Sequence, residues 1–191
     1  MSVTDMPPVD MTSPEHRVEL LQEMESILAD RYRVEITEIG DVHLTMSPSY
    51  RHALLAHNLQ VWLMALVGKD MLVMGGSHIA TSGFGLREPD MMVIDAAGVP
   101  EDTWAAPASQ VRLAIEVNSP SNPENDWQTK VDAYAASGIA YYWIVGLDER
   151  VTMFTLATDA QGQARYVRAP LERPTVAELV ARIELPPGVT L

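Results

Sequence analysis

The sequence contains no cysteine, and only 13 of its 191 residues are lysine or arginine. The absence of cysteine excludes disulfide bridges, thiolate metal sites, iron–sulfur clusters and cysteine nucleophiles. Long apolar runs are also missing, because stretches such as Val61 to Val67 fall far short of the ~20 residues that span a bilayer. Asp5 and Asp10 stand where a signal peptide would carry positive charge. We therefore expect a cytoplasmic protein with no membrane partner.

Acidic residues are plentiful, with 26 aspartates and glutamates and a formal net charge of −13. Seven of these acids lie within residues 1–30, against Arg17 alone. An acidic balance disfavours a broad phosphate-binding surface. With 47% hydrophobic residues, the composition is typical of a globular chain rather than a disordered one.

The pattern along the chain predicts one domain with a short tail. We expect residues 1–12, which contain Pro7-Pro8 and no periodic apolar pattern, to form a disordered N-terminal arm, and residues 13–191 to form a single domain. Apolar residues at helical spacing predict helices, and alternating or continuous apolar runs predict strands. The predicted helices cover about 13–30, 50–67, 124–137 and 176–183, and the predicted strands cover about 33–46 as a hairpin, 72–81 with a break at Gly75-Gly76, 90–95, 111–118, 139–145, 151–156 and a segment near Tyr166. This order predicts an α/β fold with a mixed central sheet flanked by helices.

Two acids occupy unusual places in the predicted strands. Asp90 follows Pro89 at the start of an apolar strand, and Glu116 lies inside the apolar strand that ends at Asn118. An unpaired acid among apolar neighbours costs several kcal/mol, so a charge at Glu116 requires a reason. Glu116 and Asn118 share a strand face, and the backbone carbonyl of Val117 lies between them. Two carboxylates and a carbonyl form a hard oxygen site suited to Mg²⁺ or Mn²⁺.

The predicted helix that follows carries a polar column. Asp126, Lys130 and Tyr134 recur at every fourth position, which places them on one helix face. Lys130 is one of two lysines, against eleven arginines. The departure from arginine suggests a specific use for an amine at this position.

Together these motifs resemble a known family. They are Arg87-Glu88-Pro89-Asp90, then Glu116-Val117-Asn118-Ser119-Pro120-Ser121, then Asp126, Lys130 and Tyr134, and then Gly138 with Tyr142-Trp143-Ile144-Val145. Their order and spacing are similar to those of the Uma-two family of restriction endonuclease-like proteins, in the PD-(D/E)XK nuclease superfamily. The resemblance covers roughly residues 30–185 and includes Ser47-Pro48-Ser49 followed by His52.

The resemblance implies a restriction-endonuclease-like fold and the metal-dependent hydrolysis of DNA phosphodiester bonds, with Mg²⁺ or Mn²⁺ as the cofactor. Asp90 and Glu116 correspond to the metal ligands of the superfamily, with the backbone carbonyl of Val117 as a third. The chain has Asn118 where the motif usually has lysine, and the family pattern places the lysine on the next helix, at Lys130. Asp90, Glu116 and Lys130 are therefore the predicted catalytic residues.

Four more residues are predicted to support the site. His52, on the second predicted helix, is expected near the acids, where it can bind a water or a phosphate. The predicted supporting set is His52, Asn118, Asp126 and Tyr134. The remaining histidines are assigned no role; they are His16, His43, His57 and His78.

Simple structural roles for these residues, and two different functions for the chain, also agree with the sequence. Asp90 after a proline is typical of a turn or cap residue, and Asp126 with Lys130 can form an exposed ion pair worth about 0.3–0.5 kcal/mol.

Asn118 in the lysine position and the charge of −13 favour a catalytically degenerate nuclease fold that acts as a binding or interaction module. A hydrolase of small phosphate esters is a third hypothesis.

The charge also limits how the chain could hold DNA. We expect weak, salt-sensitive DNA binding. A basic groove would have to use few residues or be completed by a partner, with a homodimer as one arrangement. The candidates for that groove are Arg51, Arg87, Arg112 and Lys130.

Overall fold

The computed structural model describes residues 10–28, 31–100, 102–118, 125–169 and 173–191. Residues 1–9 of the predicted arm and the predicted turn from Ser119 to Pro123 lie outside the described residues. Among the described residues, no helix has both the length and the apolar character needed to cross a bilayer.

The described strands form two mixed sheets. The larger sheet contains, in spatial order, β11 (Ala164–Arg168), β10 (Val151–Thr158), β9 (Tyr141–Val145), β8 (Val111–Val117), β6 (Met91–Asp95) and β3 (Met71–Met74). The smaller sheet contains β2 (Val42–Met46), β1 (Tyr32–Ile36), β5 (Leu86–Arg87), β4 (His78–Ala80) and β7 (Ala105–Pro107). Each sheet has one parallel pair, β8 with β9 and β4 with β7.

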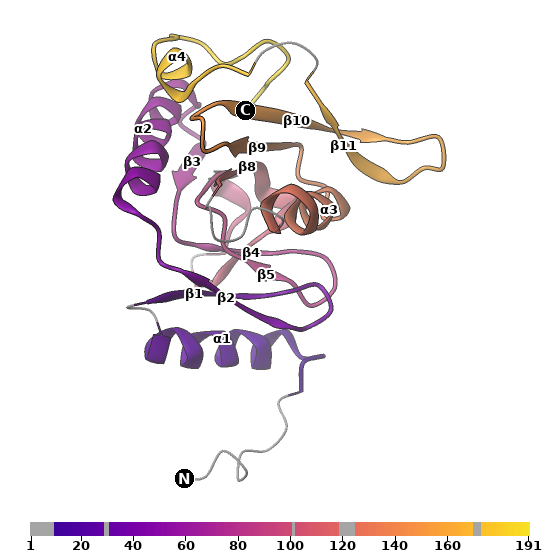
Figure 1. The fold of residues 1–191 in the computed structure, drawn as a ribbon. Helices are drawn as coiled ribbons and strands as arrows, with labels where there is room; N and C mark the ends of the chain where they lie inside the picture. The colour runs from indigo at the N-terminus through magenta and orange to yellow at the C-terminus, as the bar shows by residue number, and fades with distance from the viewer. Residues whose placement is uncertain (1–9, 29–30, 101, 119–124, 170–172) are drawn as a thin grey trace.

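Helices cover these sheets in layers (Figure 1). Helix α1 (Pro14–Leu28) lies against the smaller sheet, where Leu21 packs on Val34 and Ile36 of β1. Helices α2 (Tyr50–Leu66) and α4 (Val176–Val180) cover one face of the larger sheet, and α3 (Lys130–Ala136) covers the other. Two 3₁₀ turns, Ala96–Gly98 and Ala108–Gln110, flank β7, and a π-helical turn, Asn125–Thr129, precedes α3.

The α/β class and the mixed sheet flanked by helices are confirmed, and the structure adds a second sheet. The predicted strand over 72–81 divides at Gly75-Gly76, so that β3 joins the larger sheet and β4 joins the smaller one. A Cβ atom on Gly75 would lie 2.9 Å from the carbonyl oxygen of Asp90. Glycine therefore lets two chain segments pass close to each other where they cross between the sheets.

The second crossing positions the candidate site. Strand β5 of the smaller sheet leads through Glu88, Pro89 and Asp90 directly into β6 of the larger sheet. These three residues therefore form the junction of the two sheets. Their side chains can reach groups on both sheets.

Candidate functional site

Asp90 directly precedes β6, and Glu116 lies on the neighbouring strand β8. Strands β6 and β8 pair antiparallel with Met91 opposite Ile115 and Met92 opposite Ala114. Asp90 precedes β6, and the same register continued by one residue would place it opposite Glu116. Directly opposed residues project from the same face of a sheet, with Cβ atoms about 4.5–5.5 Å apart. Glu116 lies on the face that α3 covers, where it contacts Lys130 and Tyr134, whereas Asp90 contacts His52 of α2.

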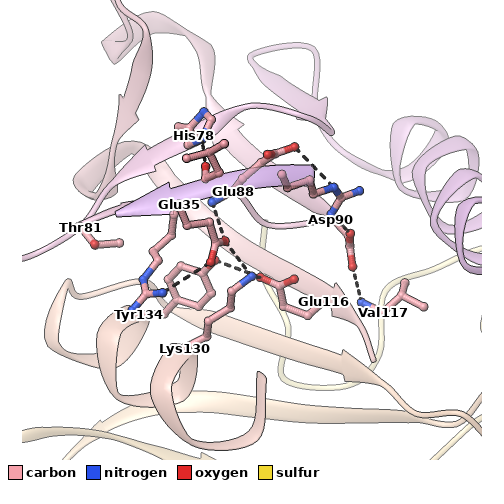
Figure 2. Close-up of polar contacts among 12 residues, drawn as sticks. Glu35, His78, Thr81, Glu88, Asp90, Glu116, Val117, Lys130 and Tyr134 are labelled. Atoms are coloured by element: carbon pink, nitrogen blue, oxygen red, sulfur yellow. Dashed lines mark hydrogen bonds and ion pairs between the residues drawn. The ribbon is translucent and has the colours of Figure 1, made fainter. Parts of the chain in front are cut away.

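Asp90 is nearly buried and has three partners. Its Oδ2 accepts a hydrogen bond of 2.7 Å from the backbone N–H of Val117 and lies 2.9 Å from Nε2 of His52, while its Oδ1 forms an ion pair with Arg33. Burial alone would raise the pKa of Asp90, but the hydrogen bond to His52 and the charge of Arg33 outweigh it and lower the pKa to about 2. Asp90 is therefore a carboxylate at neutral pH. Figure 2 shows its link to Val117 at the edge of β8.

Glu116 is buried among groups from α3. The ammonium group of Lys130 lies 2.9 Å from its Oε1, and the hydroxyl of Tyr134 donates a hydrogen bond of 3.0 Å to the same atom. Burial and the nearby charges of Glu116 and Glu35 raise the pKa of Tyr134 well above its ordinary value, so its hydroxyl stays protonated. Lys130 and Tyr134 of the predicted column thus point into the site, and the exposed ion pair proposed for Lys130 is wrong because only 5% of Lys130 is exposed.

Glu35 is a candidate residue that the sequence pattern did not reveal. Its Oε1 lies 2.9 Å from the ammonium group of Lys130 and accepts a hydrogen bond of 2.9 Å from the backbone N–H of Glu88. Burial opposes the charge, but Lys130 and Arg87 lower the pKa of Glu35 below its ordinary value. Glu35 alternates with Val34 and Ile36 on β1, which is typical of a solvent-facing position in a hairpin. The burial of Glu35 arises because both faces of β1 are covered, and this covering is a tertiary feature that the local sequence does not show.

These contacts divide the centre into two groups of side chains (Figure 2). We call one the inner cluster; it contains Glu35, Glu116, Lys130 and Tyr134. We call the other the outer cluster; it contains Arg33, His52, Glu88 and Asp90. Burial raises the pKa of Glu88, and the charge of Arg33, whose Nε lies 3.8 Å away, offsets part of this effect.

The remaining predicted residues are placed as follows. Asn118 follows β8, and its Oδ1 is buried with no hydrogen-bond partner among the described residues. Asp126 lies in the π-helical turn, but its side chain is outside the described residues. Val117 offers its N–H to Asp90, and the role of its carbonyl as a ligand stays a prediction.

The predicted basic groove is wrong for two of its four members. Arg87 is fully buried and forms ion pairs with Glu35 at 3.4 Å and with Glu38, to which its Nε donates a hydrogen bond of 3.0 Å. Lys130 is buried in the inner cluster. Both cations neutralise internal acids, because a buried charge without a partner is strongly unfavourable. Arg51 and Arg112 are exposed, although each faces an acid.

The residues present fit a divalent cation. Asp90 and Glu116 supply carboxylate oxygen donors, the ligand type that Mg²⁺ and Mn²⁺ prefer. Arg33 and Lys130 now neutralise these carboxylates. Arg33 is the more exchangeable of the two, because 26% of its side chain is exposed against 6% for Lys130.

Comparison with known proteins gives a family. The family model Uma2, described as a putative restriction endonuclease, matches residues 18–188. No curated protein matches the chain. Among solved structures, the chain is similar to the crystal structure of a putative nuclease of the DUF820 group from Anabaena variabilis, with a TM-score of 0.57 and 15% identity over 78% of this chain and 90% of that one. At this identity the likeness shows the fold alone. Because the family model spans most of the sequence, the chain belongs to the Uma2 family, which is described as putative restriction endonucleases.

Proposed function

We propose that the protein is a Mg²⁺- or Mn²⁺-dependent endodeoxyribonuclease that hydrolyses phosphodiester bonds. One observation carries the proposal. Asp90, just before β6, and Glu116, on the neighbouring strand β8, are both buried carboxylates, and the ammonium group of Lys130 lies 2.9 Å from Glu116. A carboxylate pair with an adjacent amine is suited to holding a cation and stabilising the charge that develops on a phosphate.

Asp90 and Glu116 would hold the cation, with the backbone carbonyl of Val117 as a third ligand. When bound, such a cation acts as a Lewis acid on a phosphoryl oxygen and makes a water more acidic. Asp90 is suited to this role because its low pKa, about 2, keeps it ionised at neutral pH. The N–H of Val117 fixes its orientation.

Lys130 would orient the attacking water or neutralise charge on the phosphate. It is held between two carboxylates, with 2.9 Å to Glu35 and 2.9 Å to Glu116. Lys130 would thus take the place of the lysine that the motif usually has at position 118, because its amine reaches Glu116 from α3. Glu35 and Tyr134 are positioning residues that act through Lys130 and Glu116.

Arg33 and His52 would meet the DNA backbone at the mouth of the site. Both now contact Asp90. When a cation takes their place on Asp90, the guanidinium group of Arg33 can turn to a phosphate, which it recognises through paired hydrogen bonds. Because the chain carries a net charge of −13, we propose that DNA binding is weak and falls steeply with salt.

The test is the nicking of supercoiled plasmid in Mg²⁺ or Mn²⁺. Wild-type protein should nick, whereas Asp90→Asn and Glu116→Gln should lose activity by a factor of about 10²–10³, on the scale of removing a group that stabilises transition-state charge. Glu149→Gln, which changes a partly exposed acid paired with Arg51, is the matched control and should nick normally. Activity that survives both site substitutions would contradict the proposal.

A second candidate function is a binding module that has lost catalysis. Two observations favour it: the ion pair between Arg33 and Asp90, and asparagine at position 118. The same assay separates the two. Wild-type protein that binds plasmid in a gel-shift assay but never nicks it in Mg²⁺ or Mn²⁺ would support the module.

A further inference from the structure

A second cluster of ligand-type side chains shares Glu88 with the outer cluster. Glu25 comes from α1, His78 from β4, and Glu88 from the junction before β6. One ligand atom from each residue lies within 4.8 Å of the others. The three residues are far apart in the sequence and belong to different layers, so their convergence is a product of the fold.

The cluster is held mostly inside the protein. His78 is 4% exposed and Glu88 is 9% exposed, while about a quarter of the Glu25 side chain is open to solvent. Two carboxylates in such a place repel each other and are costly to bury without a cation. Arg33 reaches Glu88 at 3.8 Å but is shared with Asp90. The negative charge at Glu25 and Glu88 is therefore only partly neutralised by this arginine.

A fourth donor completes the arrangement. Nε2 of His78 lies 3.0 Å from the backbone carbonyl oxygen of Val34 and 3.6 Å from Oε1 of Glu25. Neighbouring ligand atoms around a cation are roughly 3 Å apart, since metal–ligand bonds are about 2.0–2.2 Å long. The distances around Nε2 match that spacing. Figure 2 shows His78 and Glu88 on the same side of the junction, away from Lys130.

We propose that Glu25, His78 and Glu88 bind a first-row transition-metal dication of the Zn²⁺ type, with the carbonyl of Val34 as a further ligand. An imidazole among carboxylates selects Zn²⁺, Co²⁺ or Mn²⁺ over Mg²⁺, which prefers oxygen ligands and keeps several waters. The site is therefore distinct in chemistry from the carboxylate pair of Asp90 and Glu116.

The bound cation would stabilise the fold by cross-linking separate elements. It would join α1 to β4 and to the junction that carries Asp90, two residues beyond Glu88. Binding to the folded state alone raises stability by mass action. The proposal does not depend on the nuclease activity.

The competing arrangement has no metal. In it, His78 donates a hydrogen bond from Nε2 to the carbonyl of Val34, and no cation joins Glu25 to Glu88. The two arrangements differ in whether His78 and Glu25 are needed for the binding of a transition metal.

Co²⁺ is the probe, because its visible absorption changes in position and intensity when protein ligands replace its water and alter its coordination geometry. Chelator-treated full-length protein is titrated with Co²⁺ in excess Mg²⁺, which occupies the carboxylate pair of Asp90 and Glu116. Wild-type protein should bind one equivalent with a visible band, and Zn²⁺ should displace it. His78→Gln and Glu25→Gln should each weaken binding at least tenfold and lose the rise in melting temperature that Zn²⁺ causes. Glu23→Gln, at an exposed position of the same helix, is the matched control.

Several outcomes decide the proposal. Asp90→Asn should keep the Co²⁺ band, so this test is independent of the nuclease assay. If His78→Gln does not fold, Glu25→Gln decides, because it changes a partly exposed helix residue. Wild-type protein that binds no Co²⁺ under these conditions, or folded variants at Glu25 and His78 that bind it as wild type does, would overturn the proposal.

Discussion

The inner and outer clusters contain the same kinds of groups but differ in how firmly these are held. In the inner cluster, Lys130 lies between two carboxylates, and 6% of its side chain is exposed. In the outer cluster, Arg33 contacts Asp90 and Glu88, and 26% of its side chain is exposed. A buried cation between buried anions cannot leave without a large cost, whereas a partly exposed guanidinium can exchange its partner for a ligand. The inner cluster therefore positions groups, and the outer cluster is where a cation and a phosphate would enter.

Removing the ammonium group of Lys130 from the inner cluster should have the largest effect on stability. Lys130→Met leaves Glu35 and Glu116 buried without their shared partner, and we expect the free energy of unfolding to fall by about 3–5 kcal/mol. Urea denaturation measures this. Lys69→Met changes the other lysine, which is exposed, and should stay close to wild type. Equal stability of the two variants would contradict the claim that Lys130 holds the inner cluster together.

Removing one hydrogen bond from the inner cluster should have a smaller effect. Tyr134→Phe keeps the ring that packs against Tyr142 at 5.2 Å between centroids and removes the donor to Glu116. We expect a loss of about 1.5–3 kcal/mol, as for a buried hydrogen bond to a charged group. Urea denaturation again gives the value. A variant as stable as wild type would show that Glu116 does not depend on this hydroxyl.

A change in the outer cluster should alter binding more than stability. Arg33→Gln removes the cation that competes for Asp90. We expect stability to fall by less than in Lys130→Met, because Asp90 keeps His52 and the N–H of Val117 as partners, and the affinity for Mg²⁺, measured by calorimetry, to rise several-fold. The matched control is Arg51→Gln, an exposed arginine paired with Glu149. A loss of Mg²⁺ affinity in Arg33→Gln would mean that Arg33 supports the cation site instead of competing with it.

The smallest effect concerns the supporting ion pair between Arg87 and Glu38. Burial opposes the charge of Glu38, but the hydrogen bond and charge of Arg87 lower its pKa below the ordinary value of 4.5. The folded state thus binds a proton less readily than the unfolded state, so this pair stabilises the protein above about pH 4.5 and loses its effect as the pH falls through the lower folded pKa. The difference in melting temperature between wild type and Glu38→Gln should therefore shrink from about pH 7 to about pH 3. A difference that does not change with pH would contradict this assignment.

The sequence predicted the acids and helix residues whose signals are local. Glu116 is conspicuous as an acid within an apolar strand, Asp90 follows a proline at a strand start, and Lys130 and Tyr134 share one helix face. Each of these patterns depends on residues within a few turns of one helix or within one strand. The structure then brings three of the four into contact, with Lys130 and Tyr134 both on Glu116.

The sequence could not predict features that arise between the sheets. Glu35 and Arg33 alternate with apolar residues on β1, a pattern that indicates a solvent face when the covering layer is unknown. His78 received no role because its burial depends on α1 and on the crossing of the chain at Gly75-Gly76. Arg87 was expected on the surface, but two acids from β1 and the following turn make its burial favourable.

The proposed nuclease chemistry requires Asp90 and Glu116 to share one divalent cation. Anomalous diffraction from crystals of the full chain grown with Mn²⁺ would locate that cation. We expect a peak within about 2.2 Å of an oxygen from each carboxylate, with Arg33 displaced from Asp90. A shared cation site would be contradicted if crystals grown in saturating Mn²⁺ showed no peak between the two carboxylates and Arg33 still paired with Asp90.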